Sequence, residues 1–400
     1  MTSILGRAID DGSTVQPLAG IRVVDMTRNL AGPYSTMMLG DLGAEVIKIE
    51  SPGGDELRHL MPFPHRPPDA EDLFGMFNRN KRSVTLDLKT DRGKDVLRRL
   101  IGMGDIFIQN LAPGAADRLG FGWDDVRAIN PRVVYVNISG FGPDDTRRAY
   151  DGVIQAASGL MDITGFPDGP PLLTGMAIGD LSTSLFSAFG MVSALRLVKQ
   201  TGRGVRIDVA MLDALMALHG GEAAAYLASG EHISRMGNEY PHRAPCNVYL
   251  TADDRYVLVV TSNPIWPRLC QALELGDLEH RPEFLTNHDR VAHRGELNAY
   301  LQDRIRELSA EELCARLLDH DVPHSVVATI PEALDSAYTA AHDMVLEIDG
   351  PLRDGRASLH VMGFPYKMSE GQAAVRYGPP RLGEANDYVL HDLLGLPDDY

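Results

Sequence analysis

One aspartate stands where it could act as a nucleophile. Asp180 follows Gly179 and opens a long apolar stretch, 180–199, that is typical of a helix. A carboxylate at a helix N-terminus stays ionised, and an ionised carboxylate can attack an acyl carbon. The glycine before it would allow a substrate to approach closely. Aspartate is also a favoured N-cap residue, and its position alone favours that capping role.

Basic residues lie near the ends of several predicted strands. Three lie within 78–82 (NRNKR), just before a strand. Arg118 lies near the end of the segment 110–120 (NLAPGAADRLG), which follows a strand, and Arg147 and Arg148 precede Tyr150. Loops at the carboxyl ends of the strands of a doubly wound sheet converge on one crevice. Together these cations predict a site for a polyanion such as a nucleotide diphosphate. Taken singly, 78–82 reads as a solvated basic patch and 110–120 as a proline–glycine loop.

Other kinds of site are not supported. The first turn after a strand, 27–33 (TRNLAGP), has one glycine instead of the three of GxGxxG, which argues against NAD or FAD. His242 and Cys246 have a possible ligand spacing but no second pair, so we predict no metal site. The loop 235–243 is a candidate for binding a substrate carboxylate, or simply a surface loop. Its candidate residues are Arg235, Asn238, His242 and Arg243.

Composition narrows the class of protein. The 400 residues carry a formal charge of −17, from 38 basic and 55 acidic side chains, so we expect neither nucleic acid nor an anionic membrane as a partner. The most apolar window, 185–198, looks too short and too polar to span a membrane. Three cysteines, an odd number, together with the lack of an apolar N-terminal signal, predict a cytoplasmic protein.

The order of strands and helices predicts an α/β fold. Strand-like runs alternate with helical ones, which is typical of an open sheet with helices on both faces. Two alternating runs about a tight turn, 247–251 and 256–261, predict a hairpin and a change of domain. We therefore expect a large domain at 1–220, a smaller α+β domain at 221–330, and a return to the large domain at 331–400. The predicted strands are 21–26, 45–50, 83–88, 105–109, 132–138 and 205–209, and the predicted helices are 33–42, 91–103, 180–199 and 212–229.

Long blocks of the sequence resemble one family. PLAGIRVVDMTRNLAGPYSTMMLGDLGAEVIKIESPGGDELR, from Pro17, is similar to the opening of the class III CoA-transferases (CaiB/BaiF type), which include formyl-CoA transferase and the α-methylacyl-CoA racemases. FNRNKRSVTLDLKTDRGK and GDLSTSLFSAFGMVSALRLVKQTGRG match further family blocks. The resemblance covers nearly the whole chain from residue 17. It implies a Rossmann-like large domain and a small domain that form a ring-shaped subunit in an interlocked homodimer.

The resemblance also implies a reaction. Family transferases carry CoA from an acyl-CoA to a carboxylic acid through a mixed anhydride and a thioester on an aspartate, which here is Asp180. CoA is thus a substrate, and no permanently bound cofactor is expected. Tyr150 and Asp151 fall where the family lines the reaction centre. The positions that match family contacts to CoA are Leu30, Ala31, Leu86, Lys89, Asn110, Leu111, Arg118 and Arg148.

Departures from the family pattern bear on the choice of reaction. The racemase branch has a His-Asp pair where this chain has Tyr150-Asp151, and tyrosine is a poor proton shuttle near neutral pH, so transferase is favoured over racemase or epimerase. Leu30 replaces a glutamine of several transferases. The lack of a run of four glycines argues against oxalate as acceptor, and the block YDGVIQAASGLMDITG favours succinyl-CoA and small dicarboxylic or hydroxy acids. An NAD-dependent oxidoreductase and a non-catalytic CoA-binding protein stay as alternatives.

Overall fold

The computed structural model describes residues 6–7, 16–60, 72–349 and 357–397. These residues divide into two compact units. Unit 1 draws on Met1–Ser158, Gly175–His219 and Leu334–Tyr400, and unit 2 on Gly159–Thr174 and Gly220–Ala333. Unit 2 thus includes the segment 159–174, which the domain boundaries expected from the sequence, 221 and 330, leave out. Parts of the expected large domain, 1–5, 8–15, 61–71, 350–356 and 398–400, lie outside the described residues.

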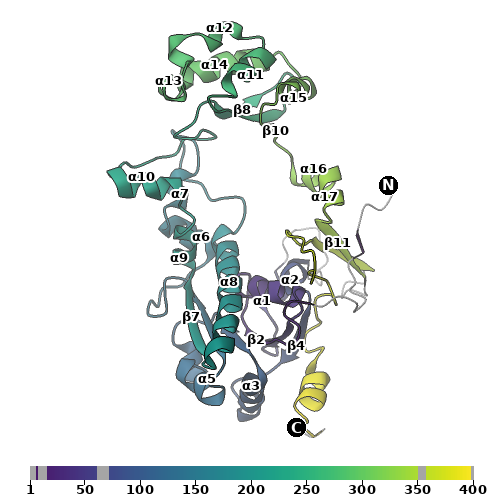
Figure 1. Cartoon of the computed structure of the whole chain (residues 1–400). Coiled ribbons are helices and arrows are strands. Elements are labelled where there is room, and N and C mark those ends of the chain that lie inside the picture. The colour runs from purple at the N-terminus through teal and green to yellow at the C-terminus, as the bar shows by residue number, and fades with distance from the viewer. Residues whose placement is uncertain (1–5, 8–15, 61–71, 350–356, 398–400) are drawn as a thin grey trace. The chain divides into compact units, whose positions relative to one another are not determined.

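Unit 1 is built on a six-stranded parallel sheet in the order β4-β3-β2-β5-β6-β7 (Figure 1). The α/β prediction is therefore confirmed. The order reverses beside β2, since the chain runs outward from β2 to β3 and β4 and then returns to β5 on the other side. Ligands of open α/β sheets bind outside the carboxyl ends of the strands at such a reversal. The strands are β2 (Arg22–Met26), β3 (Glu45–Glu50), β4 (Lys81–Thr85), β5 (Ile106–Gln109), β6 (Val134–Ser139) and β7 (Val205–Ala210).

The other elements of unit 1 cover this sheet or extend it. A second, small sheet pairs β1 with β11 in parallel and β11 with β12 in antiparallel orientation. Its strands are β1 (Gly6–Arg7), β11 (Val345–Asp349) and β12 (Ser358–Met362). The helices are α1 (Ala31–Asp41), η1 (Glu56–Arg58), α2 (Asp72–Asn78), α3 (Asp91–Met103), α4 (Ala115–Leu119), α5 (Trp123–Ile129), α6 (Asp151–Ala157), α8 (Ile178–Thr201), α9 (Met211–Met216), α17 (Ala337–Ala341) and η3 (Tyr388–Leu393).

The two faces of the sheet differ in chemistry. Successive residues of a strand face opposite sides, so Val24 and Met26 point away from Asp25. Val24 and Met26 join an apolar cluster with α3 residues such as Leu97 and Leu100. On the opposite face, α1 lies against Asp25, and its Thr36 hydroxyl donates to that carboxylate at 2.6 Å. One face is therefore an apolar core, and the other carries buried charge.

That charged face is a network of fully buried ion pairs. Lys81 Nζ lies 3.1 Å from Asp25 Oδ2, and Lys48 Nζ lies 2.8 Å from Asp55 Oδ2, with all four side chains excluded from solvent. Burial raises the pKa of Asp25, but Lys81 and Lys48, with hydrogen bonds from two threonines, lower it to about 2. Burial lowers the pKa of Lys81 to about 8 against the attraction of Asp25. Both members of the Asp25–Lys81 pair are therefore charged at neutral pH.

The basic segment 78–82 belongs to this buried face. The sequence placed the third strand at 83–88, but β4 begins at Lys81, and Arg79 and Lys81 are almost fully buried. The Arg79 guanidinium lies 2.8 Å from Asp41 Oδ2. Arg82, the third cation, lies 3.7 Å from Glu45 Oε1. The interpretation of 78–82 as a solvated patch or a polyanion site is therefore wrong for Arg79 and Lys81, whose charges are neutralised inside the unit, whereas Arg82 is partly exposed.

Helix α8 is the longest helix of unit 1. By length and composition it could cross a membrane, with a mean hydropathy of 1.4 over its best window, so the expectation that this stretch is too short and too polar was wrong. It nevertheless packs into the unit beside α1, with small side chains such as Ser184 and Ser187 buried on one side (Figure 1). It ends at Gly202, whose φ of +70° makes the C-terminal cap that the sequence predicts.

The predicted helix 212–229 is broken in two. Helix α9 stops at Met216, and α10 (Gly221–Ser229) starts only at the glycine pair, with Gly220 as its N-cap and Gly221 as its first residue. The boundary between the two units falls within this break, between His219 and Gly220. Glycine costs about 1 kcal/mol in a helix interior relative to alanine, so a pair of glycines favours interruption there.

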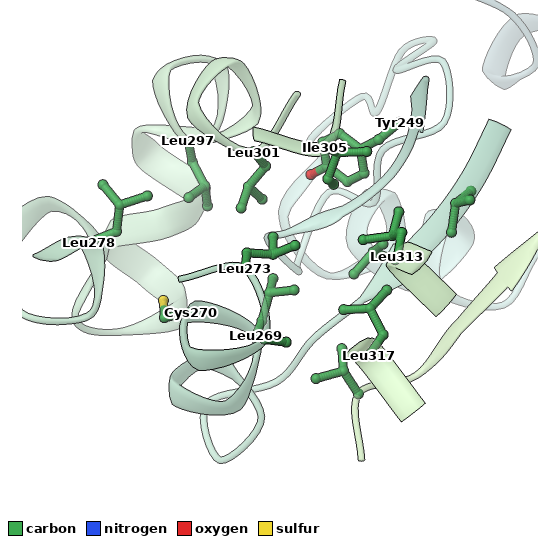
Figure 2. Packing of buried hydrophobic residues seen from close by; sticks show 14 of the residues in the cluster. Tyr249, Leu269, Cys270, Leu273, Leu278, Leu297, Leu301, Ile305, Leu313 and Leu317 are labelled. Atoms are coloured by element: carbon green, nitrogen blue, oxygen red, sulfur yellow. The ribbon is translucent and has the colours of Figure 1, made fainter. Parts of the chain in front are cut away.

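Unit 2 is a small α+β unit with its own core. The predicted hairpin is confirmed as β8 (Cys246–Leu250) and β9 (Tyr256–Val260), which β10 (His324–Val326) joins in antiparallel pairing. Figure 2 shows Leu269, Leu273, Leu301 and Leu313 of its helices gathered in the buried cluster. The remaining elements are α7 (Leu160–Ile163), α11 (Trp266–Ala272), α12 (Gly276–Glu279), η2 (Pro282–Phe284), α13 (Asn287–Ala292), α14 (Arg294–Ile305), α15 (Ala310–Asp319) and α16 (Ile330–Leu334), the last of which reaches the boundary with unit 1.

The buried network predicts an unequal response to loss of charge. In Lys81→Met the Asp25 carboxylate stays buried without its main partner, and we expect the free energy of unfolding to fall by roughly 3–5 kcal/mol. Arg99→Met removes an exposed pair with Asp95 on α3 and is expected to cost under about 0.5 kcal/mol. Urea unfolding of both variants measures the difference. Equal stability of the two variants would contradict the structural role of the network.

Candidate active site

Asp180 lies in the first turn of α8. The helix begins two residues earlier than the sequence suggested, its N-cap is Ala177, and no side chain caps it from that position. The interpretation of Asp180 as the N-cap residue is therefore wrong. Its carboxylate is partly buried and is not used to hold the helix end, so it is available for another role.

Asp151 does the capping instead. It is the first residue of α6, and its Oδ1 accepts hydrogen bonds from the backbone amides of Gly179 at 2.7 Å and Asp180 at 3.2 Å. Its Oδ2 accepts from Gln155 Nε2 at 2.6 Å. A carboxylate from a neighbouring helix thus satisfies two of the unpaired amides at the start of α8. This contact fixes α6 against the turn that carries Asp180.

Gly179 is required by this contact. A Cβ at position 179 would lie 2.9 Å from Asp151 Oδ1 and 3.4 Å from the Ile154 side chain. The sequence suggested that the glycine allows a substrate to approach. The structure shows that it allows α6 to approach, so that Asp151 can reach the amides of α8.

The same contact changes the acidity of Asp180. Burial raises the pKa of Asp180 to about 7, and the negative charge of Asp151 adds to the increase. The positive end of a helix opposes this by favouring the carboxylate, but it is worth only about 0.3–1 kcal/mol at most sites. The expectation that Asp180 is held firmly ionised by its helix is therefore wrong. At neutral pH it is close to half ionised.

Helix α8 is tied directly to the first βα turn. The Ser184 hydroxyl donates to the carbonyl oxygen of Ala31 at 2.7 Å. Ala31 is the buried first residue of α1, and Leu30, half-buried, is its N-cap. Both are among the residues that the family resemblance assigns to CoA. The structure therefore links that pair to the helix of Asp180.

A cavity of about 310 Å³ opens at the carboxyl ends of β2 to β5. Among the residues expected to contact CoA, Leu86, Lys89 and Leu111 line it. It also contains Arg28 and Lys48, which the sequence argument did not select. Arg28 could have been found, because it follows β2 just as Lys89 follows β4. The full lining is Met26, Thr27, Arg28, Lys48, Ile49, Glu50, Ser51, Gly54, Asp55, Leu86, Asp87, Leu88, Lys89, Leu111 and Leu119.

Asn110 joins the two loops at the point where the strand order reverses. Its Oδ1 accepts from the backbone amide of Arg28 at 2.9 Å, and its Nδ2 donates to the Arg28 carbonyl at 2.8 Å. The side chain of Asn110 is therefore occupied within the protein. Its position beside the cavity lets it shape the loop after β2.

The remaining expected residues of unit 1 lie outside the cavity lining. Arg118 is exposed on α4, one residue before Leu119, which does line the cavity. Arg148 and Tyr150 are exposed in the loop between β6 and α6, and Tyr150 is 70% exposed. Within the described residues, Arg118 and Arg148 have no acidic partner.

The candidate substrate residues of the small domain lie in unit 2. Arg235 donates to the Asp162 carbonyl at 3.0 Å and to its carboxylate at 3.3 Å, so its charge is already paired there. Asn238, His242 and Arg243 are exposed. Among the residues that the structure describes, no three His, Cys, Asp or Glu side chains are grouped as metal ligands.

Comparison with known proteins identifies the family. The family model described as CoA-transferase family III matches residues 18–386. A formyl-CoA:oxalate CoA-transferase of Streptomyces coelicolor is 36% identical, over 96% of this chain and 97% of the relative, and a succinyl-CoA:glutarate CoA-transferase of Mus musculus is 34% identical, over 97% and 89%. A solved CAIB/BAIF family protein from Brucella suis has a TM-score of 0.84 at 33% identity, covering 94% of this chain and 99% of that one. The chain therefore belongs to CoA-transferase family III.

Membership settles the class of protein. The chain is an enzyme, a CoA transferase, as the resemblance in its sequence blocks predicted. The alternative of an NAD-dependent oxidoreductase is wrong, as is that of a protein without catalytic activity. Enzymes of this class act on CoA thioesters, so CoA belongs to the reaction as part of a substrate.

The raised pKa of Asp180 predicts a pH dependence. With Asp180 as the nucleophile that the family resemblance implies, only its carboxylate form attacks a carbonyl carbon, so we expect kcat/KM for the acyl-CoA to fall about tenfold per pH unit below about pH 7. Asp151→Asn removes the negative charge that raises this pKa, and the acidic limb should move to lower pH. Rates measured from pH 5 to 9 test both statements.

A charge control belongs with this experiment. Asp144→Asn removes the same charge from an exposed position in the loop before α6, and its profile should match that of the unaltered enzyme. An acidic limb that stays in place in Asp151→Asn, or that moves to higher pH, contradicts the electrostatic coupling of the two aspartates.

Proposed function

We propose that this enzyme transfers CoA from an acyl-CoA, with succinyl-CoA as the donor expected, to a small dicarboxylic acid. Three kinds of relative support the dicarboxylic acceptor: they are named formyl-CoA:oxalate, acetyl-CoA:oxalate and succinyl-CoA:glutarate CoA-transferases. The observation that carries the proposal is that the Asp180 carboxylate lies in the first turn of α8 but does not cap the helix, because Asp151 does so.

The first half of the proposed reaction loads the enzyme. An Asp180 carboxylate oxygen attacks the thioester carbon, the C–S bond breaks, and the products are an aspartyl–acyl mixed anhydride and CoA thiolate. The thiolate then attacks the aspartyl carbonyl of the anhydride. The donor acid leaves as a carboxylate, and CoA is held as a thioester on Asp180.

The second half reverses these steps with a different acid. A carboxylate oxygen of the acceptor attacks the aspartyl thioester, which releases CoA thiolate and forms a new mixed anhydride. The thiolate attacks the acyl carbonyl of the acceptor. The new acyl-CoA leaves, and Asp180 is again a free carboxylate, so bonds and charges balance over the cycle.

The pKa of Asp180 suits both directions of this exchange. A carboxylate whose conjugate acid has a pKa near 7 is more basic, and thus more nucleophilic, than an ordinary one, while enough of it is ionised at neutral pH to react. Its own amide and that of Gly179 are occupied by Asp151. The donors that stabilise the developing oxyanion must therefore be other groups, and in this proposal Asp151 is a positioning residue.

In this proposal CoA occupies the strand-end cavity. Leu86, Lys89 and Leu111 line it. Ala31, which follows the half-buried Leu30 in the first βα turn, accepts a hydrogen bond from Ser184 of α8. Arg118 and Arg148 are exposed cations without acidic partners among the described residues, as groups that meet phosphates should be. Tyr150 is the N-cap residue of α6, immediately before Asp151, and borders the proposed reaction centre by its position.

The proposed attack of the CoA thiolate on the Asp180 carbonyl carbon predicts a covalent adduct on this side chain. Incubation with succinyl-CoA should add CoA to the peptide that contains Asp180, and hydroxylamine should release the CoA as a free thiol and convert that side chain to a hydroxamate. Asp180→Ala should lower the rate of CoA exchange by at least about 10⁴-fold, because every covalent intermediate of the proposed reaction is formed on this side chain. Peptide mass spectrometry and an exchange assay with succinate, glutarate and oxalate provide the measurements.

A neighbouring variant controls for disturbance of the helix end. Ser182→Ala alters the same turn and keeps the carboxylate, because the Ser182 hydroxyl only donates to the Gly179 carbonyl at 3.0 Å. It should retain most of the exchange activity. Exchange at full rate in Asp180→Ala would sink the proposed mechanism.

We further propose that the enzyme is a homodimer, in the interlocked arrangement of ring-shaped subunits expected from the family. One side of α8 supports this, because it presents large apolar side chains to solvent, with Phe189 75% exposed. Apolar patches of this kind mark interaction sites on soluble proteins. The exposed apolar residues of the helix are Leu185, Phe186, Phe189, Val192 and Leu197.

A charge placed on this side of α8 should disrupt the dimer. We expect Phe189→Glu to sediment as a monomer, or to shift the dissociation constant by at least about 100-fold, because a buried unpaired carboxylate is costly. Ala128→Glu places the same charge on the exposed side of α5 and should leave the dimer intact. Analytical ultracentrifugation distinguishes the two, and a dimeric Phe189→Glu would place the interface elsewhere.

A cytoplasmic location completes the proposal. Cys246, Cys270 and Cys314 are all free thiols, and Cys246 and Cys270 are buried. Three unpaired cysteines fit a reducing compartment, where disulfides are rare.

A further inference from the structure

We propose that the guanidinium of Arg28 binds a phosphate group of CoA in the strand-end cavity. This inference rests on the proposed function and adds a residue to its binding site. Arg28 follows β2 at the reversal of the strand order, it lines the cavity, and its side chain is exposed. Arginine suits this role because its planar fork of donors matches phosphate oxygens.

The backbone at Arg28 is held on every side. Asn110 pairs with both its amide and its carbonyl group. On the β3 side, Lys48 Nζ donates to the Thr27 carbonyl at 2.9 Å, and Asp55 Oδ1 accepts from the Asn29 amide at 3.3 Å. Asn29 has a φ of +62°, a conformation that these contacts stabilise. A fixed backbone loses little further entropy when its side chain binds a ligand.

The cations around the turn divide into two groups. Lys48, Lys81 and Arg58 are buried, and each has a carboxylate partner inside unit 1 at 2.7 to 3.1 Å. Arg28 and Lys89 are exposed at the cavity, and neither side chain has an acidic partner among the described residues. The buried cations are therefore committed to the fold, and the two at the cavity keep their charge for a ligand.

The lining of the cavity matches the parts of CoA. Leu86, Leu88, Leu111 and Leu119 provide apolar surface for uncharged portions of the molecule. Of the lining carboxylates, Glu50 and Asp55 face basic partners within the unit. Asp87 has no such partner in the described chain and accepts from the Lys89 amide at 3.0 Å. Two free cations against this one carboxylate leave the cavity net positive in a chain of charge −17.

Arg28→Gln tests the inference in the full-length enzyme. We expect KM for succinyl-CoA to rise about tenfold with little change in kcat, because one charge-assisted contact made equally in the bound and reacting states is lost. The slope of log KM against log salt should become less steep, because one ion pair with the substrate is gone. Arg28→Lys should restore part of the affinity, because it keeps the charge but not the planar fork.

The matched control is Arg132→Gln, which removes an exposed arginine before β6, away from the cavity lining; its KM should equal that of the unaltered enzyme. Calorimetry with CoA and with dephospho-CoA identifies the phosphate. If Arg28→Gln weakens CoA alone, the 3′-phosphate is the partner, and if it weakens both, the diphosphate is. An unchanged KM, or a loss confined to kcat, overturns the inference.

Failure of the proposed function has a different signature. In that case the unaltered enzyme forms no adduct at Asp180, whatever the behaviour of Arg28→Gln. An active unaltered enzyme with a normal adduct and an insensitive Arg28→Gln contradicts only the role of Arg28.

Discussion

The buried pair of Asp25 and Lys81 is the interaction on which the rest of unit 1 depends. It crosses the sheet from β2 to β4 on the face that α1 covers, and Asp25 also accepts from Thr27 and Thr36. The pair therefore holds three things in one place: the strand that precedes the first turn, the turn itself and the helix that follows it. An apolar core would bury as much surface, but it could not specify which carbonyls and amides of the turn point outward.

Contacts of the first turn connect this buried network to the candidate active site. Lys48 extends the network to the Thr27 carbonyl, and Ser184 connects the start of α1 to α8. These contacts fix the position of the Asp180 carboxylate, because the helix that carries it is anchored to the first βα turn. Catalytic groups on helices are held more precisely than groups on loops. The proposed reaction benefits from this, because the CoA thiolate must attack two carbonyls beside this side chain, first that of the aspartyl group and then that of the acceptor acyl group.

Much of this was predictable from the sequence, and the failures share a cause. The six strands alternate with helices in a way that local patterns reveal, and long matching blocks pointed to the family. By contrast, 78–82 looked like a surface patch because a run of cations normally is one, and only the fold brings Asp41 and Asp25 against it. The same limit applied to Gly179 and Asp151, which lie 28 positions apart in the chain but in contact in space. Pairings between distant residues decide burial and acidity, and a single sequence does not show them.

Asp151 and Asp180 illustrate how two identical side chains at adjacent helix starts take opposite roles. The Asp151 carboxylate accepts hydrogen bonds from the backbone amides of Gly179 and Asp180. Asp180 is left without those donors, and burial beside another carboxylate raises its pKa to about 7. If the amides had bound Asp180 instead, they would have stabilised its charge and made it a weaker nucleophile. Capping α8 from a neighbouring helix thus satisfies the helix end and at the same time keeps basic the carboxylate that we propose as the nucleophile.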